Sequence, residues 1–221
     1  MKKNCYYAIV MFMALGFNAN AQKLTTVSAT VGTQGFGLDV KHSPTPEYGL
    51  RAGFSILPIS VGFGFTAQST PSDVDVDADL QNAHLMFDWH PFAKADGFRK
   101  FMVSGGAGYF WKSRGTAVIT PNETYSYGDI IIPPGEAGNL TGTIKWAKLA
   151  PYAGIGFESA IPKSNFNVNF TLGAYYMGRP ETSLTGTGLV SVDEANERQL
   201  SENLKDYRFL PVIQLGINYT L

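Results

Sequence analysis

This sequence of 221 residues offers few side chains for acid–base or metal chemistry, since its three histidines stand at positions 42, 84 and 90. His84 and His90 fall on one segment of alternating character, about 20 Å apart if that segment is a strand, which is too far to share a metal ion. Asp88 lies between them on the same face, and Ser104 follows on a neighbouring segment. A hydrolase would need such groups within hydrogen-bond reach. Because no motif surrounds Ser104, we predict no catalytic, cofactor-binding or metal site.

Charged residues form a second candidate group, because they fall on the polar faces of alternating segments. Buried charges are costly unless they are paired or hydrated. We therefore expect these charges to form a cross-strand network that fills the interior of a barrel. The alternative is that they line a narrow water path that favours anions. The predicted lumen set is Asp39, Lys41, Arg51, Asp88, Lys112, Arg114, Lys148, Glu158 and Arg208.

The elements that must position these residues are strands, because apolar residues recur at every second position over segments of about ten residues. That is the length a tilted strand needs to cross a bilayer. The apolar face carries aromatic residues at its ends, and the polar face carries charges and glycines, as in a barrel with a polar lumen. We predict a bulge at Pro58 that keeps the apolar face continuous beyond it. The predicted strands cover residues 25–32, 36–41, 48–65, 83–91, 101–114, 145–159, 166–177 and 207–221.

The connections between these strands alternate between short and long, as in barrels with short periplasmic turns and long external loops. Eight strands place both termini in the periplasm. Glycine and proline are absent from residues 192–206, where leucine and alanine recur at helical spacing, so we predict a short helix in the last external loop. Four carboxylates from Asp73 to Asp79 lack the glycine turn and closing Glu of a calcium loop. The long external loops are predicted at residues 67–79, 115–139 and 184–206.

The N-terminus has the three parts of a secretory signal peptide: Lys2 and Lys3, an apolar stretch over residues 6–17, and the small residues of Ala19-Asn20-Ala21. We predict a signal peptide over residues 1–21 and one mature domain over 22–221. The apolar stretch is shorter than the roughly 20 residues of a membrane-spanning helix. Cys5, the one cysteine, lies inside the signal, which excludes disulfides and thiol chemistry from the mature chain.

The composition argues against nucleic-acid binding, because a formal net charge of −1 provides no basic excess to attract phosphate. Charged residues make up 16% of the chain and aromatic residues 13%. This profile suits a β-protein that exposes apolar surface to lipid, although a secreted β-sandwich would have a similar one.

The chain resembles the small outer-membrane β-barrel proteins of Gram-negative bacteria, and its plan is similar to the outer-membrane protein A-like and W-like barrels. The resemblance rests on Gly32-Thr-Gln-Gly-Phe-Gly37, Asp88-Trp-His-Pro-Phe92, Ala150-Pro-Tyr-Ala-Gly-Ile-Gly156 and the alternating ending from Phe209 to Leu221. It implies insertion by the barrel-assembly machinery. Such proteins commonly end on an aromatic residue, whereas this chain ends on Leu221, so Tyr219 or Phe209 would supply the aromatic signal.

The sequence thus predicts an all-β fold: an eight-stranded antiparallel transmembrane β-barrel with long external loops and a short helix before the last strand. We expect a non-enzymatic protein of the bacterial outer membrane in contact with outer-membrane lipid, with a role in envelope structure, surface interaction with an unidentified extracellular ligand, or porin-like passage of small molecules. The alternatives are a membrane-embedded lipid-modifying enzyme and a secreted soluble ligand-binding barrel or sandwich.

Overall fold

The computed structural model of the chain describes residues 25–67, 70–95, 98–122, 124–127, 129–133, 136–160, 165–190 and 192–221. The predicted signal peptide lies outside these residues. The elements are β1 (Thr25–Gly32), β2 (Gly35–His42), β3 (Tyr48–Ala67), β4 (Thr70–Trp89), β5 (Phe101–Pro121), β6 (Tyr125–Tyr127), β7 (Ile130–Ile132), β8 (Leu140–Lys145), β9 (Leu149–Ala160), β10 (Phe166–Tyr176), β11 (Glu181–Gly186), α2 (Glu194–Leu204) and β12 (Phe209–Thr220).

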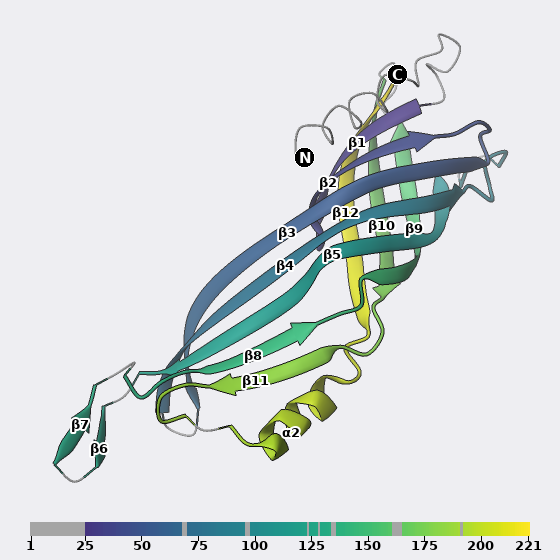
Figure 1. Ribbon diagram of the computed structural model, residues 1–221. Coiled ribbons are helices and arrows are strands. Elements are labelled where there is room, and N and C mark those ends of the chain that lie inside the picture. The colour runs from purple at the N-terminus through teal and green to yellow at the C-terminus, as the bar shows by residue number, and fades with distance from the viewer. Residues whose placement is uncertain are drawn as a thin grey trace, which may run out of the picture.

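Eight strands form an antiparallel ring in the order β1-β2-β3-β4-β5-β9-β10-β12. The last strand pairs with the first, from Thr26 opposite Thr220 to Gly32 opposite Gln214. The first half of β5 pairs with β9, from Phe101 opposite Phe157 to Tyr109 opposite Leu149. The start of β1 and the end of β12 lie together at one end of the ring (Figure 1). We call this the terminal end and the opposite one the extended end.

The two faces of the ring reverse the usual distribution of polar and apolar residues. On β2, Asp39 and Lys41 point inward and are only 2% and 6% exposed, whereas Phe36 and Leu38 point outward and are 67% and 49% exposed. The same pattern repeats on β12, where Gln214 is buried and Leu215 is exposed. Water-soluble proteins bury such apolar side chains and expose such charges. The ring therefore exposes apolar side chains on its outer surface and buries charged and polar side chains in its interior.

Aromatic pairs flank the apolar outer surface, which we call the apolar band. Phe166 packs against Tyr219 at the terminal end, with the rings tilted and their centroids 5.0 Å apart. Tyr176 and Phe209 pair at the extended end, at 5.3 Å. From Phe209 to Tyr219 an extended strand covers about 33 Å, which a tilt of about 40° reduces to roughly 25 Å. This matches the height of the hydrocarbon-facing surface in outer-membrane barrels.

Beyond the extended end, β3, β4 and β5 continue out of the ring and are joined by β8 and β11 (Figure 1). We call this five-stranded sheet the extension. Its strands occupy parts of the predicted long loops, and the loop prediction was wrong for residues 70–79, 115–121 and 184–186. Residues 70–79 belong to β4, β5 continues to Pro121, and β11 covers residues 181–186. β4 and β5 stay paired from Gln81 opposite Lys112 to Ser72 opposite Pro121, so strand geometry persists beyond the apolar band.

The predicted bulge at Pro58 was also wrong, because Pro58 pairs with Asp79 in an unbroken β3–β4 register. The even-numbered apolar residues of the ring, such as Phe54, therefore face outward, while the odd-numbered ones beyond it, such as Val61, lie on the inner side. The irregularity lies instead in β5, where Gln81 pairs with Lys112 and Asn82 with Phe110. Trp111 is the extra residue of this bulge.

The predicted short helix is present as α2, which contacts β11 and precedes β12 (Figure 1). The side chain of Asp193 caps its first turn by accepting a hydrogen bond of 2.8 Å from the backbone N–H of Asn196. No helix in the described part of the chain combines the length and apolar character needed to cross a membrane.

Candidate functional site

An ion-pair network crosses the interior of the ring toward its terminal end. Arg51 on β3 holds Asp88 on β4 through two hydrogen bonds, from Nε at 3.0 Å and from Nη2 at 3.2 Å. The hydroxyl of Ser104 on β5 donates to the same carboxylate at 2.6 Å. Asp88 and Ser104 are 0% and 1% exposed. A buried carboxylate with a two-pronged guanidinium partner is among the stronger arrangements of charges in proteins.

Two further branches extend this network to β2 and β9. Asp39 lies 3.8 Å from Arg51 and 2.6 Å from Nε2 of His84, whose Nδ1 is 3.1 Å from the side-chain oxygen of Asn82. Lys41 donates to Glu158 at 2.6 Å and lies 3.9 Å from Asp88. His90 completes the branch, with Nε2 3.7 Å from Glu158. The network thus links β2, β3, β4, β5 and β9 across the lumen.

The geometry of the network suits charge neutralisation better than nucleophilic catalysis. The hydroxyl of Ser104 is committed as a donor to Asp88, while the partners of His84 are Asp39 and Asn82. A serine nucleophile needs its hydroxyl hydrogen-bonded to a base such as histidine. The residues that raised the hydrolase alternative therefore occupy separate branches of one structural network.

Large apolar side chains fill the interior on the extended side of this network. Tyr175 packs edge-on against Phe110 at 5.2 Å between ring centroids and against Tyr152 at 4.9 Å. Phe110, Tyr175 and Tyr152 are 0%, 1% and 6% exposed. We call this cluster the plug; it consists of Met86, Phe110, Ala150, Tyr152, Tyr175, Met177 and Val212, with Trp146 and Leu210 against it. An eight-stranded lumen is about wide enough for side chains to fill.

Glycines on the neighbouring strands make room for the plug. A Cβ atom built on Gly154 or Gly173 would contact the hydroxyl of Tyr152, and one on Gly108 would lie 2.7 Å from the ring of Tyr175. The inner face of these strands therefore lacks side chains where Tyr152 and Tyr175 point inward. Tyr152 and Tyr175 were not among the predicted lumen residues. Both alternate with glycines on the polar faces of their segments, Tyr152 with Gly154 and Tyr175 with Gly173, and this pattern was the available sequence signal for a plug.

The nine residues predicted for the lumen divide into two groups in the structure. Asp39, Lys41, Arg51, Asp88 and Glu158 lie together in the interior network described above. Lys112 and Arg114 lie on the outer face instead, because the bulge at Trp111 shifts the alternation of β5 by one residue. The network also includes His84, His90 and Ser104, which the sequence placed on inward faces but did not assign to it.

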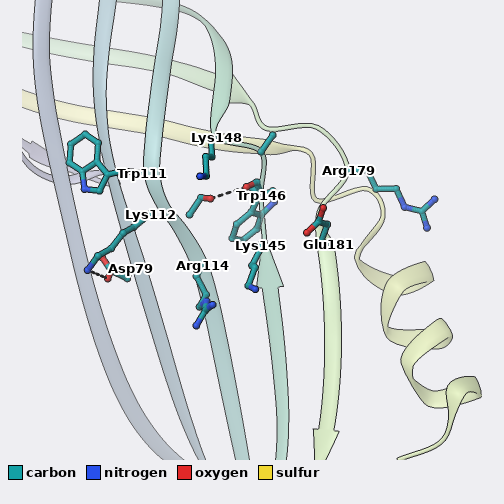
Figure 2. A pocket seen from close by; sticks show the side chains of 11 residues that line it. Asp79, Trp111, Lys112, Arg114, Lys145, Trp146, Lys148, Arg179 and Glu181 are labelled. Carbon is teal, nitrogen blue, oxygen red and sulfur yellow. Dashed lines mark hydrogen bonds and ion pairs between the residues drawn. The ribbon is translucent and has the colours of Figure 1, made fainter.

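The remaining predicted residues lie near the place where the chain passes from β8 to β9. Lys148 stands in the break at residues 146–148, beside Lys112 and Arg114, at a cavity of about 710 Å³ (Figure 2). Arg208 precedes β12, where its Nε donates to the carbonyl of Lys205 at 3.0 Å and its Nη2 lies 3.8 Å from Asp206. These four residues are therefore separate from the interior network.

Two carboxyl groups outside the apolar band, on Glu47 and Glu202, are held in their charged form by lysines. Hydrogen bonding from Lys94 lowers the pKa of Glu47 in the turn between β2 and β3. Lys205 does the same to the pKa of Glu202 on α2. Among the described residues, no group of three or more His, Cys, Asp or Glu is arranged to hold a metal ion.

Two crystal structures match most of the chain. Acinetobacter baumannii CarO, an outer-membrane β-barrel protein, is 23% identical, with a TM-score of 0.62 over 90% of this chain and 98% of that one. The chain has the fold of CarO. The structure of A. baumannii CarO2 is also 23% identical, with a TM-score of 0.64 over 89% of this chain and 98% of the other. The predicted resemblance to Gram-negative outer-membrane barrels is confirmed at the level of the fold. No protein-family model and no curated protein sequence matches the chain.

Proposed function

We propose that this chain is an integral outer-membrane barrel whose plugged interior serves as a rigid anchor for the extension on the cell surface. The observation that carries the proposal is the reversal of faces: Phe36 and Leu38 are exposed while Asp39 and Lys41 are buried. Such a surface is stable in hydrocarbon and costly in water. The short turns at the terminal end support a periplasmic position for both termini, and the extension then projects outward.

This arrangement of faces favours a membrane barrel over a secreted soluble one. A soluble ligand-binding barrel would direct its apolar residues inward, toward the ligand or the core. Here the inward positions of β12 are Val212, Gln214, Gly216 and Asn218, while Ile213, Leu215 and Ile217 point outward. Outer-membrane lipid is the partner that such a surface requires, and insertion by the barrel-assembly machinery is part of the same proposal.

The proposed role is non-enzymatic and structural, and the plug favours it over passage of small molecules. The side chains of Phe110 and Tyr175 are fully packed inside the ring, at 0% and 1% exposure, and Arg51 in the interior network is paired with Asp88. In the surface-interaction role, the extension would bind an extracellular ligand, and this binding stays a prediction.

Membrane insertion is tested with the full chain refolded into phosphatidylcholine vesicles. Folded outer-membrane barrels resist SDS until heated, so unheated and boiled samples should migrate differently on a gel. The inserted chain should also remain with the vesicles after alkaline carbonate washing. A chain that folds in buffer without lipid or detergent would contradict the proposal.

Passage is tested by conductance in planar bilayers. The parent should give a closed trace, while Phe110→Ala/Tyr175→Ala should conduct because it removes two rings of the plug. Tyr176→Ala is the matched control, since Tyr176 adjoins Tyr175 but points outward and is 43% exposed. Steady conductance by the parent would favour a passage role instead of a plugged anchor.

A further inference from the structure

The cavity on the outer face lies where one edge of the barrel wall is interrupted. β8 ends at Lys145 and β9 begins at Leu149, so residues 146–148 leave the sheet between them. Trp146 turns toward the plug, and its indole Nε1 donates to the carbonyl of Tyr207 at 2.9 Å. The departure of these residues leaves a recess of about 710 Å³ beside β5. We call it the basic recess.

Positive charge predominates around the basic recess, which is lined by five cationic and two acidic side chains. Lys112 is paired with Asp79 at 2.6 Å, and Arg179 with Glu202 at 3.5 Å. Among the residues that the structure describes, no ion pair is formed by the other three cations, which are Arg114, Lys145 and Lys148.

The three free cations are held close to one another by the sheet. Arg114 and Lys145 are direct cross-strand partners on β5 and β8, and like charges in that position repel each other. On their other sides their strand partners are Asp79 and Glu181, the two acidic residues of the lining. Their side chains run side by side in Figure 2, with Lys148 on the barrel side of them. An anion seated between them would replace this repulsion with attraction. The recess therefore has the charge of an anion site.

The level of the recess on the barrel identifies where that anion would come from. Tyr109 and Leu149 form the last cross-strand pair between β5 and β9, and both are exposed on the apolar band, at 51% and 67%. Lys148 directly precedes Leu149, and Lys112 directly follows the exposed Trp111. Tryptophan marks the boundary between hydrocarbon and headgroups. Lys148 therefore stands at the height of lipid headgroups in the proposed membrane position, and Arg114 with its strand partner Lys145 lies two residues farther along β5 than Lys112.

We propose that the basic recess binds a phosphate group, presented by the headgroup of an outer-leaflet lipid seated against the apolar band. The guanidinium of Arg114 suits bidentate recognition of phosphate, and Lys145 and Lys148 add point charges. Trp111 offers an apolar ring to the part of the lipid below the phosphate. The lipid source rests on the proposed membrane function, whereas a small phosphate anion from solution would use the same three cations.

The test is native mass spectrometry of the full chain in a neutral detergent, with diphosphorylated lipid A as the probe and inorganic phosphate as a competitor. Arg114→Gln/Lys145→Gln should weaken retention of lipid A by about tenfold or more, since charge-assisted hydrogen bonds are lost. Arg198→Gln is the matched control, because Arg198 is an exposed cation on α2 away from the recess. It should bind lipid A like the parent.

Retention of lipid A that excess inorganic phosphate does not displace supports the lipid source, and displacement at similar concentrations supports a free phosphate anion. Absence of binding by the parent, or equal binding by the parent and the double variant, overturns the proposal. The heat-dependent gel shift of the same samples reports folding separately. If the shift persists without lipid A binding, the phosphate site fails while the membrane barrel stands.

Discussion

Strand β4 runs through two regions whose outer faces have opposite chemistry. Within the ring, its outward residues are Leu85, Phe87 and Trp89, which are about half exposed. In the extension, the same face of the same strand carries Asp73, Asp75 and Asp77, and the inner face carries the buried Val74. The backbone pairing does not change between the two regions. With the ring in lipid and the extension in water, as proposed, the medium outside the sheet accounts for the difference between the two outer faces.

Removing a buried cation from the ring, compared with removing an exposed one, should give the largest difference in the free energy of unfolding. Arg51→Met should lower the free energy of unfolding by about 3–5 kcal/mol, because it leaves Asp88 and Asp39 buried without their shared cation. Lys112→Met breaks the exposed pair with Asp79 and should cost about 0–1 kcal/mol. Urea unfolding in vesicles, followed by tryptophan fluorescence, measures both.

A second variant distinguishes loss of the pair from damage to packing. Arg51→Met/Asp88→Leu removes both partners and should recover part of the stability lost in Arg51→Met, since the buried carboxylate of Asp88 is removed together with its cation. If Arg51→Met unfolds at the parent's urea concentration, the interior network does not hold the barrel together.

The outer face of β4 provides the next largest effect. Leu85→Arg places a charge within the apolar band and should cost about 2–4 kcal/mol if that face meets lipid. Asp77→Arg makes a charge substitution on the same face in the extension and should stay within about 0.5 kcal/mol. Unfolding in vesicles again gives the measurement. Equal costs at the two positions would place the extension in the membrane or the ring outside it.

The comparison also explains which parts of the fold the sequence could predict. Alternation over residues 166–176 and 209–220 predicted strands correctly, because exposed apolar residues on the outer face and buried residues on the inner face give a strict period of two. In residues 73–79 the alternation is equally regular, but acidic residues made it resemble a solvated loop. Water on the outer face of β4 accounts for those carboxylates without ending the strand.

The candidate site was less accessible from sequence, because it depends on which residues lie opposite each other. The bulge at Trp111 moves Lys112 and Arg114 to the outer face, and only the register between β4 and β5 reveals it. His84 belongs to the interior network through Asp39, which is on another strand. Alternation assigns a residue to a face but does not supply its cross-strand partner.

Replacing a glycine by alanine should produce a smaller difference in unfolding free energy between the ring and the extension. Gly173→Ala would press a methyl group against Tyr152 and against the carbonyl of Ala153, 2.7 Å away, and should cost about 1–3 kcal/mol. At Gly64 in the extension, the nearest atom to a new Cβ is an oxygen of Asp73 at 3.6 Å, an ordinary contact. Gly64→Ala should therefore be neutral or slightly stabilising. Similar losses of urea resistance in both variants would contradict a tightly packed plug beside an open extension.

The smallest effect is expected at α2, which belongs to neither the ring nor the strands of the extension. Asp193→Ala removes the cap on the backbone N–H of Asn196 and should destabilise the helix by about 1 kcal/mol. Since α2 has no buried residue, the loss should stay local. Hydrogen exchange of residues 194–204 should therefore accelerate while exchange in the ring stays unchanged. Asp206→Ala, an exposed acidic position beyond the other end of the helix, is the control and should leave helix exchange near that of the parent. Faster exchange in β12 as well would contradict this local effect. It would mean that α2 stabilises β12, and that residues 205–208, which join them, couple the extension to the ring.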